Sequence, residues 1–182
     1  MAETPNTPRK AAILAHSERY AASRAELRRR AAFFHSEDEA YLRFLIPPGA
    51  RVLDIGCGVG DTLAVLQPSL GVGVDFSPAM IDAARGRHPD LRFHAGDAED
   101  PAVIAAIGET FDYILVHDTI GSLDDCQKFF EQLHPLCTRS TRLVVGYFSH
   151  LWQPILKLAE LLNQRIPYPS QNVLAPADVA AL

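Results

Sequence analysis

The stretch VLDIGCGVGD, Val52–Asp61, decides the fold of this chain. Residues 51–55 are mostly apolar and are typical of a short buried strand. Three glycines follow at alternate positions, and a helical pattern begins directly after them. Glycines at a turn from strand to helix lack a Cβ atom, so the backbone can turn tightly and approach a ligand closely. The stretch therefore predicts a ligand-binding turn between a strand and a helix.

From residue 51 onwards, short apolar runs alternate with helical patterns. The runs YILVH at 113–117 and RLVVGYF at 142–148 are nearly continuously apolar, as expected for strands with helices on both faces. This alternation predicts right-handed βαβ units and an α/β fold with a doubly wound, mostly parallel sheet in three layers. The expected strands are Arg51–Ile55, Gly71–Asp75, Leu91–His94, Tyr113–His117 and Arg142–Phe148, and the expected helices are Gly60–Gln67, Pro78–Arg87, Pro101–Ile107 and Asp124–Leu136.

The chain before the sheet divides into two parts. Residues 1–10 contain two prolines and few apolar residues, so we expect a disordered tail. Residues 11–46 have a helical pattern, which ends at the Pro-Pro-Gly sequence of residues 47–49. We expect these N-terminal helices to form part of a substrate lid, and residues 47–182 to form the main domain. The aromatic residues expected in the lid are Tyr20, Phe34 and Tyr41.

Three acidic residues, Asp54, Asp75 and Asp97, stand at or just after the ends of the first three expected strands. Ligands of open parallel sheets bind at such strand ends. Asp54 would repel a diphosphate and attract a cationic amino group. A dinucleotide fingerprint would also need a third glycine at position 61, which is Asp61. The pattern favours a nucleoside that carries positive charge and no phosphate, as S-adenosylmethionine does. Taken singly, Asp75 could instead cap a helix and Asp97 could form an Asx turn.

With these motifs the chain resembles the class I S-adenosylmethionine-dependent methyltransferases, in particular those whose glycine loop reads LDIGCGxG. The resemblance covers about residues 42–148 and rests on VLDIGCGVGD, VGVDFSPAMIDAAR, FHAGDAED and FDYILVHDTIGSLDD, in the family's order. It implies a Rossmann-like methyltransferase fold and S-adenosylmethionine as the cofactor. By this resemblance the glycine loop holds the methionine moiety, Asp75 the ribose, and Asp97 the adenine. The implied cofactor-binding residues are Asp54, Gly56, Cys57, Gly58, Gly60, Asp75, Phe76, Asp97, Ala98 and His117.

His117 ends the fourth expected strand and Asp118 follows it; these two are the candidate catalytic residues. A general base is needed only if the methyl acceptor carries a proton, and it must reach the acceptor atom. Either residue could instead be structural, His117 as a satisfied core residue and Asp118 as a cap of the next turn.

The family's D/N-P-P-Y/F tetrapeptide, which accompanies amino-group methylation, is replaced here by His-Asp-Thr-Ile at 117–120. We therefore expect in-line methyl transfer to oxygen or carbon of a small molecule. A module that binds the cofactor without turnover, or a nucleotide-dependent oxidoreductase, stays open as an alternative.

The composition restricts the partners of the chain. The formal net charge is −5, and only residues 24–30 form a basic run, so we expect no nucleic acid partner. No run of about 18 apolar residues occurs, so we expect no membrane span. The three cysteines lie in apolar stretches without metal-binding spacing, which predicts reduced thiols, no metal site and a cytoplasmic location. Residues 151–166 favour a helix that packs on a partner or over the substrate, with a membrane-surface helix as the alternative.

The family plan has a sixth strand and an antiparallel seventh after a helix that follows the fifth strand. Pro176–Leu182 looks like the first turns of that helix, and no β-run follows it in the sequence. We therefore expect a sheet without the last two strands and with an uncovered apolar edge at the fifth strand. Such edges promote pairing with other chains, so self-association, low stability and weak or absent catalysis are expected.

Overall fold

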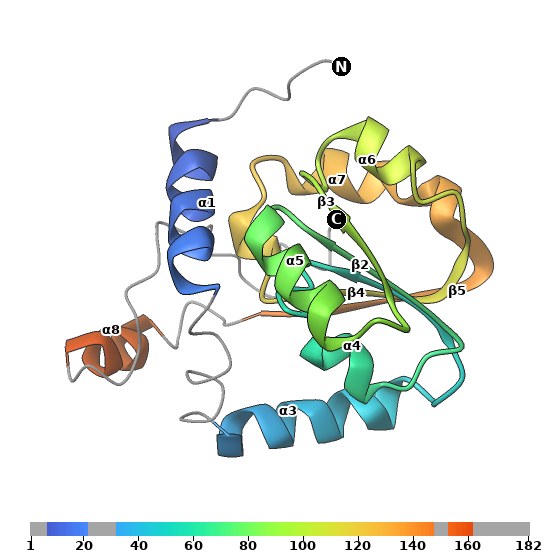
Figure 1. Cartoon of the computed structure of the whole chain (residues 1–182), viewed down its shortest axis with the longest axis horizontal. Coiled ribbons are helices and arrows are strands. Elements are labelled where there is room, and N and C mark those ends of the chain that lie inside the picture. Colours follow the sequence, from blue (N-terminus) through green and yellow to red (C-terminus); the bar gives the residue numbers. More distant parts are fainter. Residues whose placement is uncertain (1–6, 22–31, 148–152, 162–182) are drawn as a thin grey trace.

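The computed structural model describes residues 7–21, 32–147 and 153–161 (Figure 1). Its five strands form one parallel sheet in the order β3-β2-β1-β4-β5. The chain runs outward from β1 to β3 and then crosses back to the other side of β1. Open α/β sheets bind ligands at such a switch point. The strands are β1 (Arg51–Ile55), β2 (Leu70–Asp75), β3 (Arg92–Ala95), β4 (Phe111–His117) and β5 (Cys137–Gly146).

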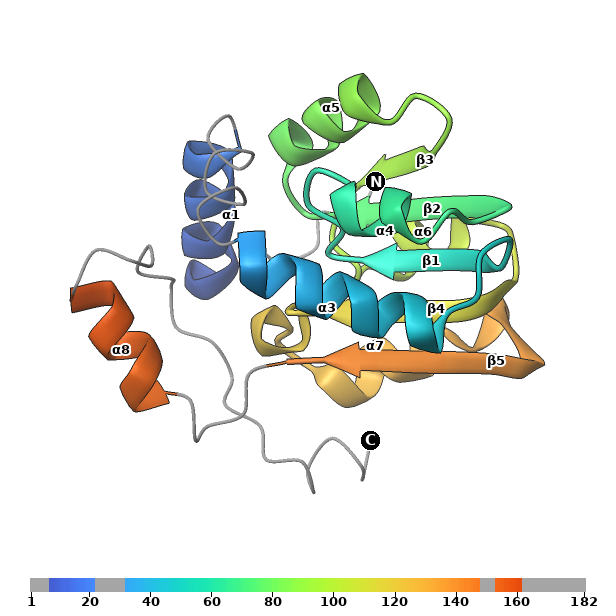
Figure 2. The same cartoon turned by 90° about the horizontal axis from the view of Figure 1, so that it is seen from below.

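Helices cover both faces of the sheet, which confirms the predicted doubly wound, three-layer α/β fold (Figure 2). Successive strand residues point to opposite faces. Val52 and Leu115 therefore pack with one set of helices, while Leu53 and Ile114 pack with the other. The first set is α3 (Ala32–Leu45), α4 (Asp61–Val65) and α5 (Pro78–Arg87), and the second is α6 (Pro101–Ala105) and α7 (Cys126–Gln132).

Helix starts follow from the local sequence. The side chains of Ser77, Asp100 and Asp125 accept hydrogen bonds from the first turns of α5, α6 and α7, respectively. In α5 and α6 a proline follows the cap, at a position where no helical hydrogen bond is lost. These caps fix where each helix begins after the sheet.

Most expected strands and helices agree with the structure to within two residues at each end, and the largest differences are in β5 and α7. β5 begins at Cys137 and not at Arg142, since Cys137 already pairs with Phe111 of β4. The residues between Cys137 and Arg142 are polar and mostly exposed, so their composition does not indicate a strand. The helix expected over 124–136 ends at Gln132 and is followed by a short 3-10 turn, His134–Leu136. Pro135 lacks the N–H that would continue the α-helix.

The expectation of a disordered tail over residues 1–10 is wrong from residue 8 onwards. α1 spans Pro8–Tyr20, and the Thr7 side chain caps it by accepting a hydrogen bond from the Lys10 N–H. Proline at the first helical position and threonine before it form a helix-start signal that outweighs the polar composition.

The helix expected over residues 151–166 is present as α8 (Gln153–Leu161). Ile155, Leu158 and Leu161 are more than half exposed, so within the described residues nothing covers this apolar face. Residues 162–182, which include the helix expected to lead to a sixth strand, lie outside the described part. Among the described strands, β5 pairs only with β4. None of the described helices is long and apolar enough to cross a membrane.

Candidate functional site

The glycine loop lies at the switch point and has left-handed backbone at all three glycines, with φ of 77° at Gly56, 54° at Gly58 and 80° at Gly60. A Cβ at Gly56 would lie 1.9 Å from the Thr119 Oγ1, and one at Gly60 would lie 2.7 Å from the Phe93 ring. A Cβ at Gly58 would meet nothing within 4 Å. Two glycines therefore allow the chain to pack on itself, and Gly58 presents bare backbone to open space.

Asp75 connects this loop to the turn after β2. Its Oδ2 accepts the Gly58 N–H at 2.8 Å, and its Oδ1 accepts the Ser77 N–H at 2.9 Å. Ser77, not Asp75, is the cap of α5, so a capping role does not explain Asp75. An ionised carboxylate has about four acceptor positions. Asp75 is thus oriented by the backbone and can accept the hydroxyls of a sugar.

Asp54 is buried at the end of β1, with 3% of its surface exposed. Burial raises the pKa of its carboxyl group to about 7, His117 lowers it, and Asp75 raises it further. A cation placed beside Asp54 would favour the ionised form. The group is suited to pairing with an amino group that enters from outside.

Asp97 follows β3 and has two partners. Its Oδ1 accepts the Glu99 N–H at 2.9 Å, which is the Asx turn considered from the sequence. Its Oδ2 contacts the Nζ of Lys10 in α1, and Glu99 Oε2 lies 2.7 Å from the same nitrogen. Burial lowers the pKa of Lys10, but the contacts with Asp97 and Glu99 outweigh this, and the net shift is upward. Sequence reasoning missed Lys10, because it lies in the stretch expected to be disordered.

Further contacts hold α1 across the carboxyl ends of the strands, beside α5 (Figures 1 and 2). The Arg9 guanidinium donates to Asp124 Oδ1 at 2.7 Å and to the Leu123 carbonyl at 3.0 Å. Glu18 Oε1 accepts the Ser77 hydroxyl at 2.6 Å. α1 therefore joins the turns that follow β2, β3 and β4.

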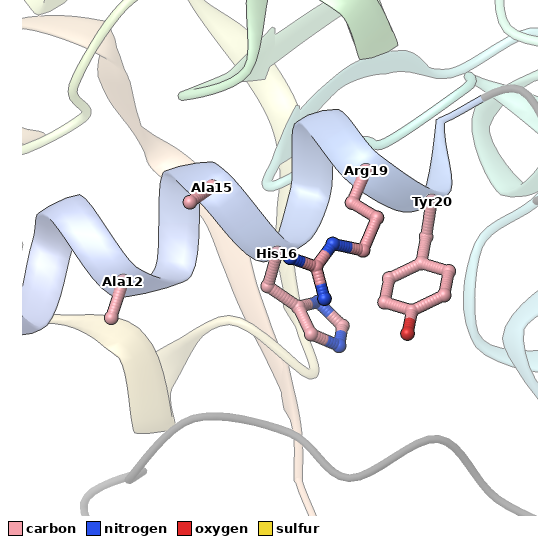
Figure 3. A pocket seen from close by; sticks show the side chains of 5 residues that line it. All are labelled: Ala12, Ala15, His16, Arg19 and Tyr20. Carbon is pink, nitrogen blue, oxygen red and sulfur yellow. The ribbon is translucent and has the colours of Figure 1, made fainter.

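A cavity of about 450 Å³ lies on α1 and is lined by Ala12, Ala15, His16, Arg19 and Tyr20 (Figure 3). Figure 3 shows the His16, Arg19 and Tyr20 side chains gathered near the end of the helix. Helical spacing puts these residues on the side of α1 opposite Lys10 and Glu18. The cavity thus lies away from the acids and the glycine loop. Of the other residues expected in the lid, Tyr41 on α3 is 61% exposed. Phe34 is also on α3, and its side chain lies outside the described part of the structure.

His117, at the end of β4, lies on the sheet face covered by α3. Its Nε2 is 3.2 Å from Asp38 Oδ1 of that helix, and its Nδ1 is 4.0 Å from Asp118 Oδ2. The ring packs on Gly146, where a Cβ would lie 2.3 Å from the His117 Cδ2. Asp118 has a left-handed backbone, with φ of 54°, and its N–H donates to the Gly146 carbonyl at 2.8 Å. The two candidate catalytic residues are neighbours in the chain, and the structure adds Asp38 of α3, for which the sequence gives no signal.

Cys57 is a packing residue. It is 8% exposed, and a Cβ at Gly73 would lie 2.7 Å from its sulfur. Burial raises the pKa of its thiol well above the ordinary value, so the thiolate is disfavoured. Its N–H donates to the Val74 carbonyl at 3.1 Å. Phe76 is half-buried directly after Asp75.

Asp61, at the position where a dinucleotide fingerprint has glycine, links two helices. Its Oδ1 accepts a hydrogen bond from Arg87 Nη2 at 2.7 Å and lies 2.9 Å from His88 Nε2. In the described part of the chain, no group of three His, Cys, Asp or Glu side chains is arranged to hold a metal ion.

A family model described as a methyltransferase domain matches residues 53–143. The chain is 43% identical over 79 residues to the magnesium-protoporphyrin O-methyltransferase of Rhodobacter capsulatus. This match covers 40% of this chain and 33% of that protein. It is 35% identical over 125 residues to the trans-aconitate 2-methyltransferase of Escherichia coli, covering 66% of this chain and 48% of that protein. The chain thus spans from about a third to half of the length of these relatives.

Among solved structures, a SAM-dependent methyltransferase of Thermotoga maritima, named as a possible histamine N-methyltransferase, has the same fold. It superposes with a TM-score of 0.73 at 18% identity, covering 93% of this chain and 77% of that one. At this identity the likeness extends to the fold alone.

Proposed function

The chain belongs to the methyltransferase-domain family, and from this we propose that it binds S-adenosylmethionine and transfers the methyl group to a small molecule. The observation that carries the proposal is the arrangement at the switch point. The open backbone at Gly58 adjoins Asp75, and Asp54 and Asp97 stand at or just after the neighbouring strand ends. Asp54 suits a cationic group and repels a phosphate, and Asp75 suits a sugar, which together fit the amino group and ribose of S-adenosylmethionine.

We assign each part of the cofactor to residues of this site. Asp54 and the loop Gly56–Gly60 take the methionine moiety, with Cys57 contributing to the loop by its packing. Asp75 accepts the ribose hydroxyls with Phe76 beside it, and Asp97 accepts the adenine amino group next to Ala98. His117 lies near the transferable methyl group.

The acceptor that we propose is an oxygen or carbon atom of a small molecule. The bound cofactor supplies a methyl group on a sulfonium, so the protein must align the acceptor with that methyl and exclude water. The chain lacks the tetrapeptide typical of amino-group methylation. One relative is named as an O-methyltransferase, which agrees with this choice. We assign α1 as part of the lid that excludes water.

We propose that His117 is the general base when the acceptor carries a proton, with Asp118 beside it. A carboxylate lies near each ring nitrogen, Asp38 Oδ1 at 3.2 Å from Nε2 and Asp118 Oδ2 at 4.0 Å from Nδ1, so the two side chains can fix the orientation of the imidazole. Asp38, 3.2 Å from Nε2, is the positioning residue that α3 contributes.

A comparison of ligands tests this function against its alternatives. S-adenosylhomocysteine should raise the melting temperature of the chain, and NAD should not, since Asp61 with its two basic partners stands where the dinucleotide fingerprint needs glycine. Stabilisation by NAD and not by S-adenosylhomocysteine would favour the oxidoreductase. Cofactor binding with no methyl transfer to any acceptor would favour the binding module.

We also propose a cytoplasmic location, no nucleic acid partner and self-association. The described chain has free thiols at Cys57, Cys126 and Cys137, which suits the reducing cytoplasm. The acidic balance argues against a nucleic acid partner. We infer self-association through β5, whose Leu143 is 48% exposed.

A further inference from the structure

The end of the site assigned to adenine already holds a cation from α1. The Nζ of Lys10 contacts Asp97 Oδ2 and lies 2.7 Å from Glu99 Oε2. Only 6% of Lys10 is exposed, so both ion pairs are shielded from solvent and salt. Lys10 is therefore held by one carboxylate inside the proposed cofactor site and by a second one beside it.

An adenine amino group and Lys10 would compete for Asp97. Both are hydrogen-bond donors that seek the same carboxylate. The Glu99 N–H already occupies Oδ1, and the ammonium contacts Oδ2. A ligand that approaches Asp97 thus meets a carboxylate whose charge is already paired.

Glu99 gives Lys10 a partner that stays in place. Its carboxylate accepts the N–H groups of Asp124 at 2.9 Å and Asp125 at 2.7 Å, which hold it at the start of α7. Arg9 and Glu18 anchor α1 independently of Lys10. Lys10 can therefore leave Asp97 while α1 remains over the strand ends.

We propose that Lys10 is a latch on the adenine end of the cofactor site: it occupies Asp97 in the free protein and moves to Glu99 alone when the cofactor binds. The inference rests on the proposed function, because the competition exists only if Asp97 accepts the adenine amino group. The apparent affinity for the cofactor is then the intrinsic affinity multiplied by the fraction of molecules in which Asp97 is free of Lys10.

Two single variants should shift cofactor affinity in opposite directions. Lys10→Met frees Asp97 and should tighten binding of S-adenosylhomocysteine, measured by calorimetry, on the order of tenfold. Glu99→Gln leaves Asp97 as the only anionic partner of Lys10 and should weaken binding about threefold. Because the effect of Glu99→Gln acts through Lys10, the double variant should bind like Lys10→Met. Arg19→Met is the matched control, with the same charge change on the opposite side of α1, and should leave the affinity unchanged.

The outcomes separate the latch from the proposed function. If Lys10→Met bound S-adenosylhomocysteine more weakly than the wild type, or equally well, the latch would be overturned. Weaker binding would show that Lys10 helps to hold the site in its binding conformation. If that variant does not fold, Glu99→Gln decides alone, and unchanged or tighter binding would contradict the latch. A wild-type chain that does not bind S-adenosylhomocysteine would overturn the proposed function and the latch together. Binding without these shifts overturns only the latch.

Discussion

Buried at the end of β1, the Asp54 carboxyl group has a pKa of about 7, chiefly because burial disfavours its charge. In the unfolded chain the same group loses its proton near the ordinary value of 3.8. The folded state therefore binds more protons than the unfolded state between these values, and stability falls as pH rises from about 4 to 7. Above pH 7 the folded protein carries the full cost of a buried charge, about 1.4 kcal/mol per unit of pKa displacement.

Asp54→Asn should remove this dependence. At pH 8 the free variant should be more stable than the wild type in urea unfolding, and near pH 4 the difference should nearly vanish. Wild-type affinity for S-adenosylhomocysteine should rise with pH up to about 7, because the ionised carboxylate pairs with the ligand's ammonium, and the variant should lack that rise. Asp82→Asn, whose side chain is 78% exposed, is the control. A variant less stable than the wild type at pH 8 would show that Asp54 stabilises the free fold.

At Asp75 we expect the largest loss of cofactor affinity from a single carboxylate. Asp75→Ala removes the acceptor of two ribose hydroxyls and should cost about 1.5–3 kcal/mol of binding free energy in calorimetry with S-adenosylhomocysteine. Asp82→Ala on the neighbouring helix should leave binding unchanged. Equal affinities of wild type and Asp75→Ala would remove the ribose assignment.

The start of α1 depends on a short local signal, Thr7 followed by Pro8. Thr7 caps the helix and its hydroxyl also donates to Asp124 Oδ2 at 3.0 Å. Thr7→Ala should destabilise α1 by about 1 kcal/mol, seen as roughly fivefold faster hydrogen exchange of its amides. Thr110→Ala, in an exposed loop, should not alter exchange in α1. Amides of α1 that exchange freely in the wild type would show that the disordered tail extends beyond residue 8.

The elements also show why sequence reasoning succeeds and where it stops. β1, β2 and β4 each contain a short apolar run, and α5 has a cap and a proline, so local chemistry identifies them. The polar start of β5 is a strand only because it pairs with β4, a contact that composition does not record. The same limit holds for the site. The acids at strand ends follow a motif, whereas Lys10 and Asp38 come from helices that tertiary packing brings to it.

On the scale of the whole molecule, the edge of the sheet governs association. β5 pairs only with β4 among the described strands, and Leu143 is 48% exposed. A charged residue on an edge strand discourages pairing with another chain. Leu143→Lys should therefore shift sedimentation at micromolar concentration toward the monomer. Thr138→Lys, also on exposed β5 but at its polar end, should shift it less. A wild-type chain that is monomeric throughout would contradict the inferred association.

A structure with S-adenosylhomocysteine would test whether one ligand site extends over the ends of β1, β2 and β3. We expect the ribose hydroxyls to bind Asp75, the adenine to lie beside Asp97, and the sulfur to face His117. The same structure would show whether Lys10 has moved to Glu99. If the ligand instead bound in the cavity lined by Ala12, His16 and Tyr20 on the far side of α1 and left the glycine loop empty, the proposed site would be wrong.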